Sequence, residues 1–153
     1  MATITGTAGF DVLEGTGSDD EIQGLQGNDL LLGNDGDDQL AGQSGNDWLY
    51  GGDGDDLLGG GTGNDYLSGG EGADTFNFGA KSGKDVITDF DVENDLLQIT
   101  KSKTIKNVAD VIKQSKFKNG DVEINLGGGN KIVLKDVSKA DFKANPEDHI
   151  QII

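Results

Sequence analysis

Residues 6–77 divide into eight units of nine residues, which read GTAGFDVLE, GTGSDDEIQ, GLQGNDLLL, GNDGDDQLA, GQSGNDWLY, GGDGDDLLG, GGTGNDYLS and GGEGADTFN. No insertion interrupts the series. In every unit the first residue is Gly, the sixth is Asp and the eighth is apolar, from Leu13 in the first unit to Phe76 in the last. A fixed period of this length is typical of a solenoid.

Each unit combines a loop with a very short strand. Gly at the first position, and at the fourth position of most units, favours a tight loop because Gly adopts positive φ without steric cost. The Asn and Asp residues common at the fifth position enter the same region more easily than other residues. The last three residues alternate as a strand does. We therefore expect each unit to form half a turn of a coil, with units eighteen residues apart stacked on one side.

Such loops turn their carbonyl oxygens inward, and each of these loops ends in one Asp. Carbonyl and carboxylate oxygens are the ligands that Ca²⁺ prefers. The expected metal ligands in the repeats are Asp11, Asp20, Asp29, Asp38, Asp47, Asp56, Asp65 and Asp74. Six pairs of these residues lie eighteen apart, from Asp11 with Asp29 to Asp56 with Asp74, and we expect each pair to share a cation.

The net charge lies entirely on the repeats. Residues 1–79 contain 13 Asp, 3 Glu and no Lys or Arg, a charge of −16, whereas residues 80–153 contain 9 Asp, 3 Glu and 12 Lys and sum to zero. Stacked strands would crowd these carboxylates and oppose the compact state. We expect the repeat block to be disordered without metal and to fold with it.

Several other functions fit the sequence less well. Phosphate-binding glycine loops precede a helix, and none is expected here. An EF-hand needs a twelve-residue loop that closes on Glu. Ligand-free acidic disorder suits the composition but not the strict period. A pI near 4.1 argues against nucleic-acid binding, and the absence of any nucleophile paired with a base argues against an enzyme.

The units resemble the nonapeptide repeats of the RTX (repeats-in-toxin, haemolysin-type calcium-binding) family, whose pattern is G-G-x-G-x-D-x-U-x. The second position is Gly only at Gly52, Gly61 and Gly70, and the second unit has its second glycine displaced to Gly17. The resemblance implies an all-β fold, a parallel β-roll that binds about six to eight Ca²⁺ ions.

Beyond Phe76 the sequence resembles the closing segment of RTX modules in secreted proteases and alginate epimerases. Placing Gly83 and Asp85 on positions four and six implies a two-residue insertion and one further half-turn. Asp85 and Asp95 would then close additional sites with Asp65 and Asp74. Asp89 is a further expected ligand, and an ordinary turn or strand-edge role remains open for all three carboxylates.

A small α+β cap is expected after the roll. Residues 105–116 place Ile105, Val108, Ala109 and Ile112 on one helical stripe, and residues 122–126 and 131–135 alternate as the strands of a hairpin. The expected segments are the repeats at 1–79, irregular closing turns at 80–100 and the cap at 101–153.

The last residues, Asp148 to Ile153, resemble the uncleaved export signals of type I secretion substrates. This resemblance implies a bacterial protein that the type I machinery secretes to the extracellular space. The first residues lack the basic and apolar regions of a cleavable signal, no run is long enough for a membrane span, and there is no cysteine. His149 is expected to be a solvated tail residue.

The outward positions of the odd-numbered units carry an apolar row that includes Trp48, Tyr50 and Tyr66. Such a patch needs a partner. The stripe of residues 105–112 is one expected cover. The alternatives are another roll, or an acidic, alginate-like polysaccharide whose sugar rings stack on these aromatic side chains, which would make the chain a polysaccharide-binding accessory module.

Overall fold

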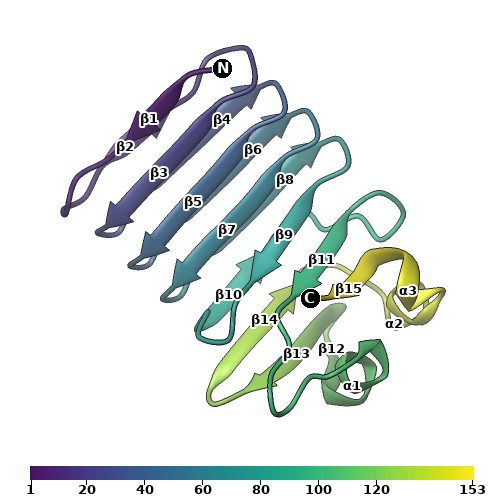
Figure 1. Ribbon diagram of the computed structural model, residues 1–153. Coiled ribbons are helices and arrows are strands. Elements are labelled where there is room, and N and C mark those ends of the chain that lie inside the picture. Colours follow the sequence, from purple (N-terminus) through teal and green to yellow (C-terminus); the bar gives the residue numbers. More distant parts are fainter.

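The computed structural model describes residues 1–153 and shows a flattened coil of short strands that winds from the N-terminus toward a helical end (Figure 1). Successive strands alternate between two sheets. Sheet A contains, in spatial order, β1 (Thr3–Thr5), β3 (Glu21–Gln26), β5 (Gln39–Ser44), β7 (Leu57–Thr62), β9 (Thr75–Phe78), β11 (Leu96–Ile99) and β15 (Ile150–Ile152).

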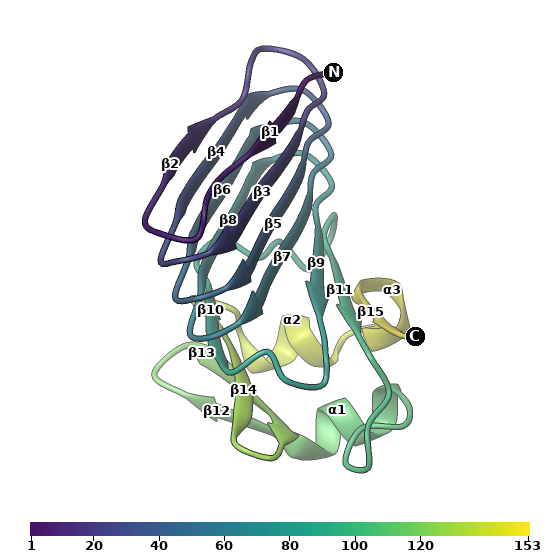
Figure 2. The same ribbon diagram turned by 60° about the vertical axis from the view of Figure 1, so that its left-hand side comes forward.

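Sheet B forms the opposite wall of the coil, as the turned view shows (Figure 2). In spatial order it contains β2 (Val12–Glu14), β4 (Leu30–Asp35), β6 (Trp48–Asp53), β8 (Tyr66–Glu71), β10 (Lys84–Ile87), β14 (Asn130–Leu134), β13 (Asp121–Gly127) and β12 (Ser115–Lys118). The predicted all-β class and parallel β-roll are confirmed.

The register within each sheet follows the repeat. Leu30 lies opposite Trp48, and Trp48 lies opposite Tyr66, in parallel strands eighteen residues apart. Val86 pairs with Tyr66, twenty residues away, so the predicted two-residue insertion is also confirmed. The sequence period therefore sets the strand pairing of the whole roll.

The core of the roll is a single row of side chains between the two sheets. The eighth residues from Ile22 to Phe76 are buried, and Ile87 and Leu97 continue the row into the closing turns. Each buried Leu or Ile contributes roughly 1.5–3 kcal/mol relative to an exposed one. One such residue per nine makes a thin core, so packing alone supports the roll weakly.

Positive φ falls at the fourth and second positions of the units, not at the fifth. Gly45, at a fourth position, has φ 141°. At the second position Leu25 and Gln43 have φ 76° and 72°, where later units have Gly. The sequence-based assignment of positive φ to the first and fifth positions was wrong, and the second-position glycine of the RTX pattern now has a physical reason.

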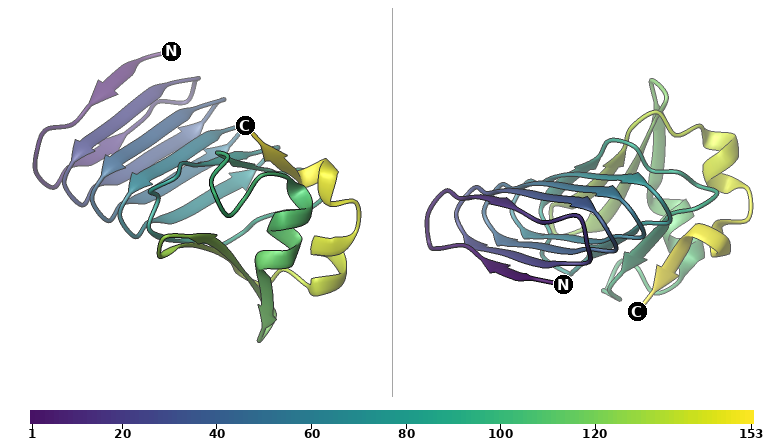
Figure 3. Two further views of the ribbon diagram at one scale, coloured as in Figure 1. Left: turned by 60° about the horizontal axis from the view of Figure 1, so that its bottom comes forward. Right: turned by 90° about the horizontal axis from the view of Figure 1, so that it is seen from above.

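The C-terminal residues contain three helices, two more than predicted, gathered at one end of the coil (Figure 3). They are α1 (Val108–Gln114), α2 (Lys139–Lys143) and α3 (Pro146–His149). Asn107 caps α1 by accepting a hydrogen bond from the Asp110 N–H. Val111 is buried and Ala109 is exposed, so the predicted stripe was partly wrong. None of the helices has the length and apolar character needed to cross a membrane.

The predicted hairpin is part of the roll. β13 and β14 pair antiparallel, and β14 pairs parallel with β10, so the hairpin extends sheet B. β15 likewise extends sheet A by pairing with β11. Strand pairing therefore crosses both of the boundaries expected near residues 80 and 101.

The C-terminal tail is packed against the closing turns. His149 is 2% exposed, its ring lies near those of Phe90 and Phe142, and its Nε2 is 3.2 Å from the Phe142 carbonyl oxygen. Burial lowers the pKa of this histidine. The prediction of a solvated tail residue was wrong because these long-range aromatic contacts have no local sequence signal.

Candidate metal centre

A ladder of aspartates runs along the two edges of the roll. Each sixth-position Asp lies between the turn of its unit and the following strand, and from Asp20 to Asp74 all are buried. Asp85 and Asp95 continue the ladder and are buried as well, whereas Asp11 at the N-terminal end is half-buried. The fold thus brings together all but one of the predicted ligands, the exception being Asp89.

From Asp20 onward, one carboxylate oxygen of each ladder residue is fixed by a backbone N–H of the preceding turn. The Asp29 N–H donates to Oδ1 of Asp47 over 2.8 Å, and the Asp47 N–H donates to Oδ1 of Asp65 over 2.9 Å. The same bond joins Asp65 to Asp85 and Asp74 to Asp95. These bonds orient the carboxylates from Asp20 onward in the same way, so the pairs predicted from the eighteen-residue spacing are in contact.

The second carboxylate oxygen has no partner in most of the ladder. Oδ2 is buried and accepts no hydrogen bond in the following residues: Asp29, Asp38, Asp47, Asp56, Asp65 and Asp85. An unpaired buried charge of this kind is strongly unfavourable. In the first two units Oδ2 instead accepts from the backbone N–H of Thr7 (to Asp11) and of Thr16 (to Asp20), each over 2.6 Å. The unpaired oxygens therefore begin at the third unit.

Four of the six unpaired oxygens lie beside a first-position glycine together with a backbone carbonyl. A Cβ atom placed on Gly24 would lie 2.6 Å from Oδ2 of Asp29 and 3.0 Å from the carbonyl oxygen of Gly42. Equivalent pairs of oxygens face Gly33, Gly42 and Gly51. A side chain at these glycines would fill the space where the oxygens converge, which gives the first-position Gly of the repeat its reason.

The mixture of oxygen types suits a hard cation. No three acidic or histidine side chains converge anywhere in the chain. The ladder instead offers single carboxylates together with main-chain carbonyls, a donor set that Ca²⁺ accepts. The carbonyl contribution of residues such as Gly42 has no side-chain signal, so the sequence indicated the carboxylates but not which carbonyls accompany them.

Burial raises the pKa of the ladder carboxyl groups. The pKa values of Asp56 and Asp85 rise to about 7, and those of Asp65 and Asp95 rise to about 6. Burial is the first cause in each case, and it is opposed by the backbone hydrogen bond. Asp20 differs, because the backbone N–H groups of Ala2 and Thr16 lower its pKa. Perturbations of this kind cluster at functional sites.

Asp89 lies apart from the ladder. This exposed residue accepts hydrogen bonds from the Ser68 hydroxyl over 2.6 Å and from the N–H groups of Gly69 and Gly70 over 3.1 Å each. Its carboxylate is therefore satisfied by protein donors and ties the closing turn to β8.

The aromatic row on the outer face of sheet B is open to solvent. Trp48 is 45% exposed, Tyr50 46% and Tyr66 49%. Helix α1 packs against β13 and β15 at the far end of the roll, so the expected cover from residues 105–112 was wrong.

Fold and site together define a parallel β-roll with a regular row of oxygen-rich, unpaired acidic sites. The sequence model of the RTX calcium-binding nonapeptide repeat matches residues 3–31, 32–67 and 60–80. The chain belongs to this family, and RTX repeats bind calcium. No curated protein sequence matches the chain significantly.

Two solved structures share the fold. The chain is 17% identical to the extracellular lipase LipA from Serratia marcescens over 99% of its own length, with a TM-score of 0.52, and it spans 40% of the lipase. It is 24% identical to the AlgE6R3 subunit of the Azotobacter vinelandii mannuronan C5-epimerase, covering 97% of itself and 80% of that subunit, with a TM-score of 0.55. At these identities the comparison establishes the architecture alone.

Proposed function

We propose that this chain is a calcium-gated folding module of a secreted bacterial protein, with a structural rather than a catalytic role. The observation that carries the proposal is the row of buried Oδ2 atoms without donors, in a segment of charge −16 that has no Lys or Arg. Without a cation this row opposes folding; with one it becomes the main support of the roll.

The ladder residues would hold the ions through Oδ2 and the neighbouring carbonyls. Bound calcium supplies two positive charges and a large, adaptable oxygen shell. The protein itself orients the ligands and keeps space for the ion. Backbone N–H groups fix Oδ1, as between Asp29 and Asp47, and the missing side chain at Gly24 keeps the site open. We assign the strongest sites to units three to seven and to Asp85, whose Oδ2 atoms are unpaired. Asp74 extends them, and the sites of Asp11, Asp20 and Asp95, whose Oδ2 atoms accept backbone hydrogen bonds, contribute least.

The expected energies suit a gate. Extracellular calcium sites have Kd values of about 10⁻⁴–10⁻³ M, and a cation at about ten times Kd stabilises the folded state by roughly 1.4 kcal/mol per site. About six to eight ions would then supply a free energy comparable to the whole stability of a typical domain. A chain in a calcium-poor compartment would stay unfolded.

Export through a type I channel follows from the same gate. Three observations support it: the family resemblance, the tail from Asp148 to Ile153, and the lack of cysteine. An extracellular lipase shares the fold. The chain would pass the channel unfolded and order itself outside, where calcium is abundant.

Circular dichroism with isothermal titration calorimetry tests the proposal. In EGTA the purified chain should lack most β structure, and millimolar Ca²⁺ should restore it cooperatively with several ions bound. Mg²⁺ should act poorly because it requires a smaller octahedral shell. A well-dispersed NMR spectrum in EGTA, or equal folding in both ions, would refute the gate.

A second candidate function is binding of an acidic polysaccharide on the outer face of sheet B. The open row of Trp48, Tyr50 and Tyr66 favours it. Trp48 is the only tryptophan, so its fluorescence reports on this face. Alginate-like oligosaccharides should quench or shift the emission, and Tyr66→Ala, which keeps the tryptophan reporter, should weaken binding. An unchanged spectrum at saturating oligosaccharide would eliminate this candidate.

A further inference from the structure

The turns of the roll lie along two opposite edges (Figure 2), and these edges differ in charge. Turns that lead from sheet A to sheet B form the neutral edge, which has no carboxylate except the ladder residues: 6–11, 24–29, 42–47 and 60–65. Turns that lead back to sheet A form the acidic edge: 15–20, 33–38, 51–56 and 69–74. Every other Asp of the repeats lies at the acidic edge and is exposed: Asp19, Asp35, Asp37, Asp53 and Asp55.

The fifth residues of the inner turns make the same stacking bond at both edges. At the neutral edge, Asn28 Oδ1 accepts a hydrogen bond from the Asn46 N–H over 2.8 Å. At the acidic edge, Asp19 Oδ1 accepts from the Asp37 N–H over 3.2 Å, and Asp37 Oδ1 accepts from the Asp55 N–H over 3.0 Å. Asn thus stacks as well as Asp does, so the stacking of the turns does not require the negative charges of the acidic edge.

These extra charges lie beside the ladder. Asp37 directly precedes Asp38, and Asp55 directly precedes Asp56. Both ladder residues have a buried Oδ2 that accepts no hydrogen bond. Because consecutive Cα atoms are only about 3.8 Å apart, each exposed charge lies within roughly one Debye length of an ion held by its neighbour, and salt screens it incompletely. Calcium at the acidic edge therefore meets negative charges that the neutral edge lacks.

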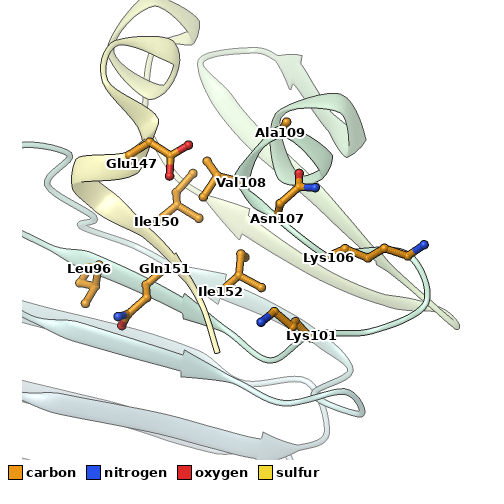
Figure 4. A pocket seen from close by; sticks show the side chains of 10 residues that line it. All are labelled: Leu96, Lys101, Lys106, Asn107, Val108, Ala109, Glu147, Ile150, Gln151 and Ile152. Atoms are coloured by element: carbon orange, nitrogen blue, oxygen red, sulfur yellow. The ribbon is translucent and has the colours of Figure 1, made fainter.

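No lysine cancels the charge of the acidic edge. The two lysine ion pairs of the chain both bond carboxylates of β13. Lys101 and Lys106 lie beside α1 and β15 at the capped end of the roll (Figure 4). At the neutral edge, Lys84 takes the fifth position before Asp85, and its N–H donates to Asn64 Oδ1 over 3.1 Å. The contrast between the two edges therefore persists in the folded chain and extends into the closing turns.

We propose that Asp37 and Asp55 are affinity-determining residues for calcium. Their charges make the inner sites of the acidic edge, at Asp38 and Asp56, bind Ca²⁺ about three- to tenfold more tightly than the inner sites of the neutral edge. This difference in affinity rests on the proposed calcium gate and deepens it. As calcium rises, the acidic row of sites fills ahead of the neutral row.

Terbium resolves the two edges while the chain stays folded. Tb³⁺ takes the same kind of oxygen ligands as Ca²⁺ and carries one more positive charge, so it favours the site with the more negative surroundings. Substoichiometric Tb³⁺ is added to the full chain in saturating Ca²⁺, with diamagnetic La³⁺ as the blank. In ¹⁵N NMR spectra, paramagnetic broadening should be stronger at Gly36 and Gly54 of the acidic edge than at Gly45 and Gly63 of the neutral edge.

Exchanging the charges of the two edges gives the matched control. The variant combines Asp37→Asn, Asp55→Asn, Asn28→Asp and Asn46→Asp, so composition and net charge stay the same. Every altered side chain keeps an Oδ1 acceptor for its stacking bond. The stronger broadening should move to the opposite edge in this variant.

The Ca²⁺ concentration at which half of the chain is folded measures the affinity for calcium itself. Asp37→Asn with Asp55→Asn should raise this concentration about twofold or more. Asp136→Asn with Glu147→Gln, which removes two exposed charges outside the repeats, should change it little.

The outcomes separate this proposal from the gate. Equal broadening at both edges of the parent chain, or the same pattern in the exchanged variant, would overturn the difference in affinity and leave the calcium gate standing. Equal shifts for the two double variants would overturn it as well. A parent chain that shows no calcium-dependent folding would refute the gate and, with it, the difference between the edges.

Discussion

The repeats and the C-terminal half bury charge in opposite ways. Between Asp29 and Asp74 the roll takes carboxylates out of water and gives them no cationic partner. Residues 101–153 keep their carboxylates and lysines near the surface, where Lys131 pairs with Glu123 at 2.9 Å and Lys135 pairs with Asp121, over an apolar core. Under the proposed calcium gate, the repeats depend on a ligand for their stability, whereas residues 101–153 do not. The same proposal makes residues 101–153 a permanently folded cap on which the repeats assemble when calcium is present.

Removing the metal should give the largest effect. In EGTA we expect amide protons of residues 24–77 to lose all protection from hydrogen exchange, because the unpaired Oδ2 atoms oppose the compact state. Protection in β13 and β14 should fall less. Residue-resolved exchange by NMR measures both. Equal loss in the two halves would end the distinction between them and indicate a single cooperative unit.

Deleting residues 148–153 should be next in size. The deletion removes β15 and the buried Ile150 and His149, so we expect a loss of about 3 kcal/mol or more in calcium. Urea unfolding measures it. Secretion by a co-expressed type I system should also stop. A Gln151→Ala variant, altered at an exposed position, should unfold like the parent chain. If the shortened chain unfolded at the same urea concentration as the parent chain, β15 would contribute nothing to the stability of the C-terminal cap.

A single ladder residue should matter according to its place. Asp47→Ala should cost about 3 kcal/mol in excess calcium because Asp47 belongs to two pairs, at about 1.4 kcal/mol for each site. Asp11→Ala should cost about half as much or less, since Asp11 belongs to one pair and its Oδ2 already accepts from Thr7. The calcium concentration at which half of the chain is folded measures the effect of each substitution. Asp53→Ala, an exposed change of equal charge, is the control; equal shifts for Asp47 and Asp11 would contradict the pairing.

Acid should partly replace calcium in the roll. The pKa values of Asp56 and Asp85 (about 7) and of Asp65 and Asp95 (about 6) exceed the unfolded value near 3.9. Groups raised in this way favour the folded state fully below about pH 4 and lose that contribution as the pH rises through about 6–7. In EGTA, circular dichroism should report more β structure at pH 5 than at pH 8. In calcium the midpoint should rise on acidification, because protons compete for the ligands. If the circular dichroism signal in EGTA did not depend on pH, burial of these carboxylates could not explain why the metal-free roll is unstable.

The smallest effect concerns backbone strain. Gln43 is exposed and has φ 72°, a conformation that costs an ordinary side chain roughly 1–2 kcal/mol. Replacing Gln43 by Gly relieves this strain, but the greater conformational freedom of Gly in the unfolded chain offsets part of the gain in stability. Gln43→Gly should therefore raise stability in urea by up to about 1 kcal/mol. Asn34→Gly is the matched control, with a smaller expected gain because Asn tolerates this region; a loss on Gln43→Gly would contradict the strain.

The sequence predicted the roll well because its pattern is local and periodic. Spacing alone gave the register of Trp48 on Tyr66 and the two-residue insertion before Asp85, since every unit repeats the same contacts. The carboxylate ladder followed from the same spacing. The carbonyls that meet each Oδ2 could not be assigned, because any residue type carries one.

The C-terminal half was predicted less well because its contacts join distant residues. His149 is buried by Phe90 and Phe142, and β15 pairs with β11 more than fifty residues earlier. Neither contact leaves a period in the sequence. The left-handed backbone at Leu25 was missed for a different reason: the residue type there disagrees with the conformation that the stacked neighbours impose.

The alternation of units between two sheets limits how such a roll changes length in evolution. Duplicating two units adds a full turn and leaves each outward column intact, so Trp48 would still lie above Tyr66. Duplicating one unit between them would move all earlier residues to the opposite wall and split that column between two faces, although the ladder of aspartates would remain unbroken. Metal binding therefore tolerates odd and even insertions alike, whereas any partner that recognises a face permits only insertions of eighteen residues.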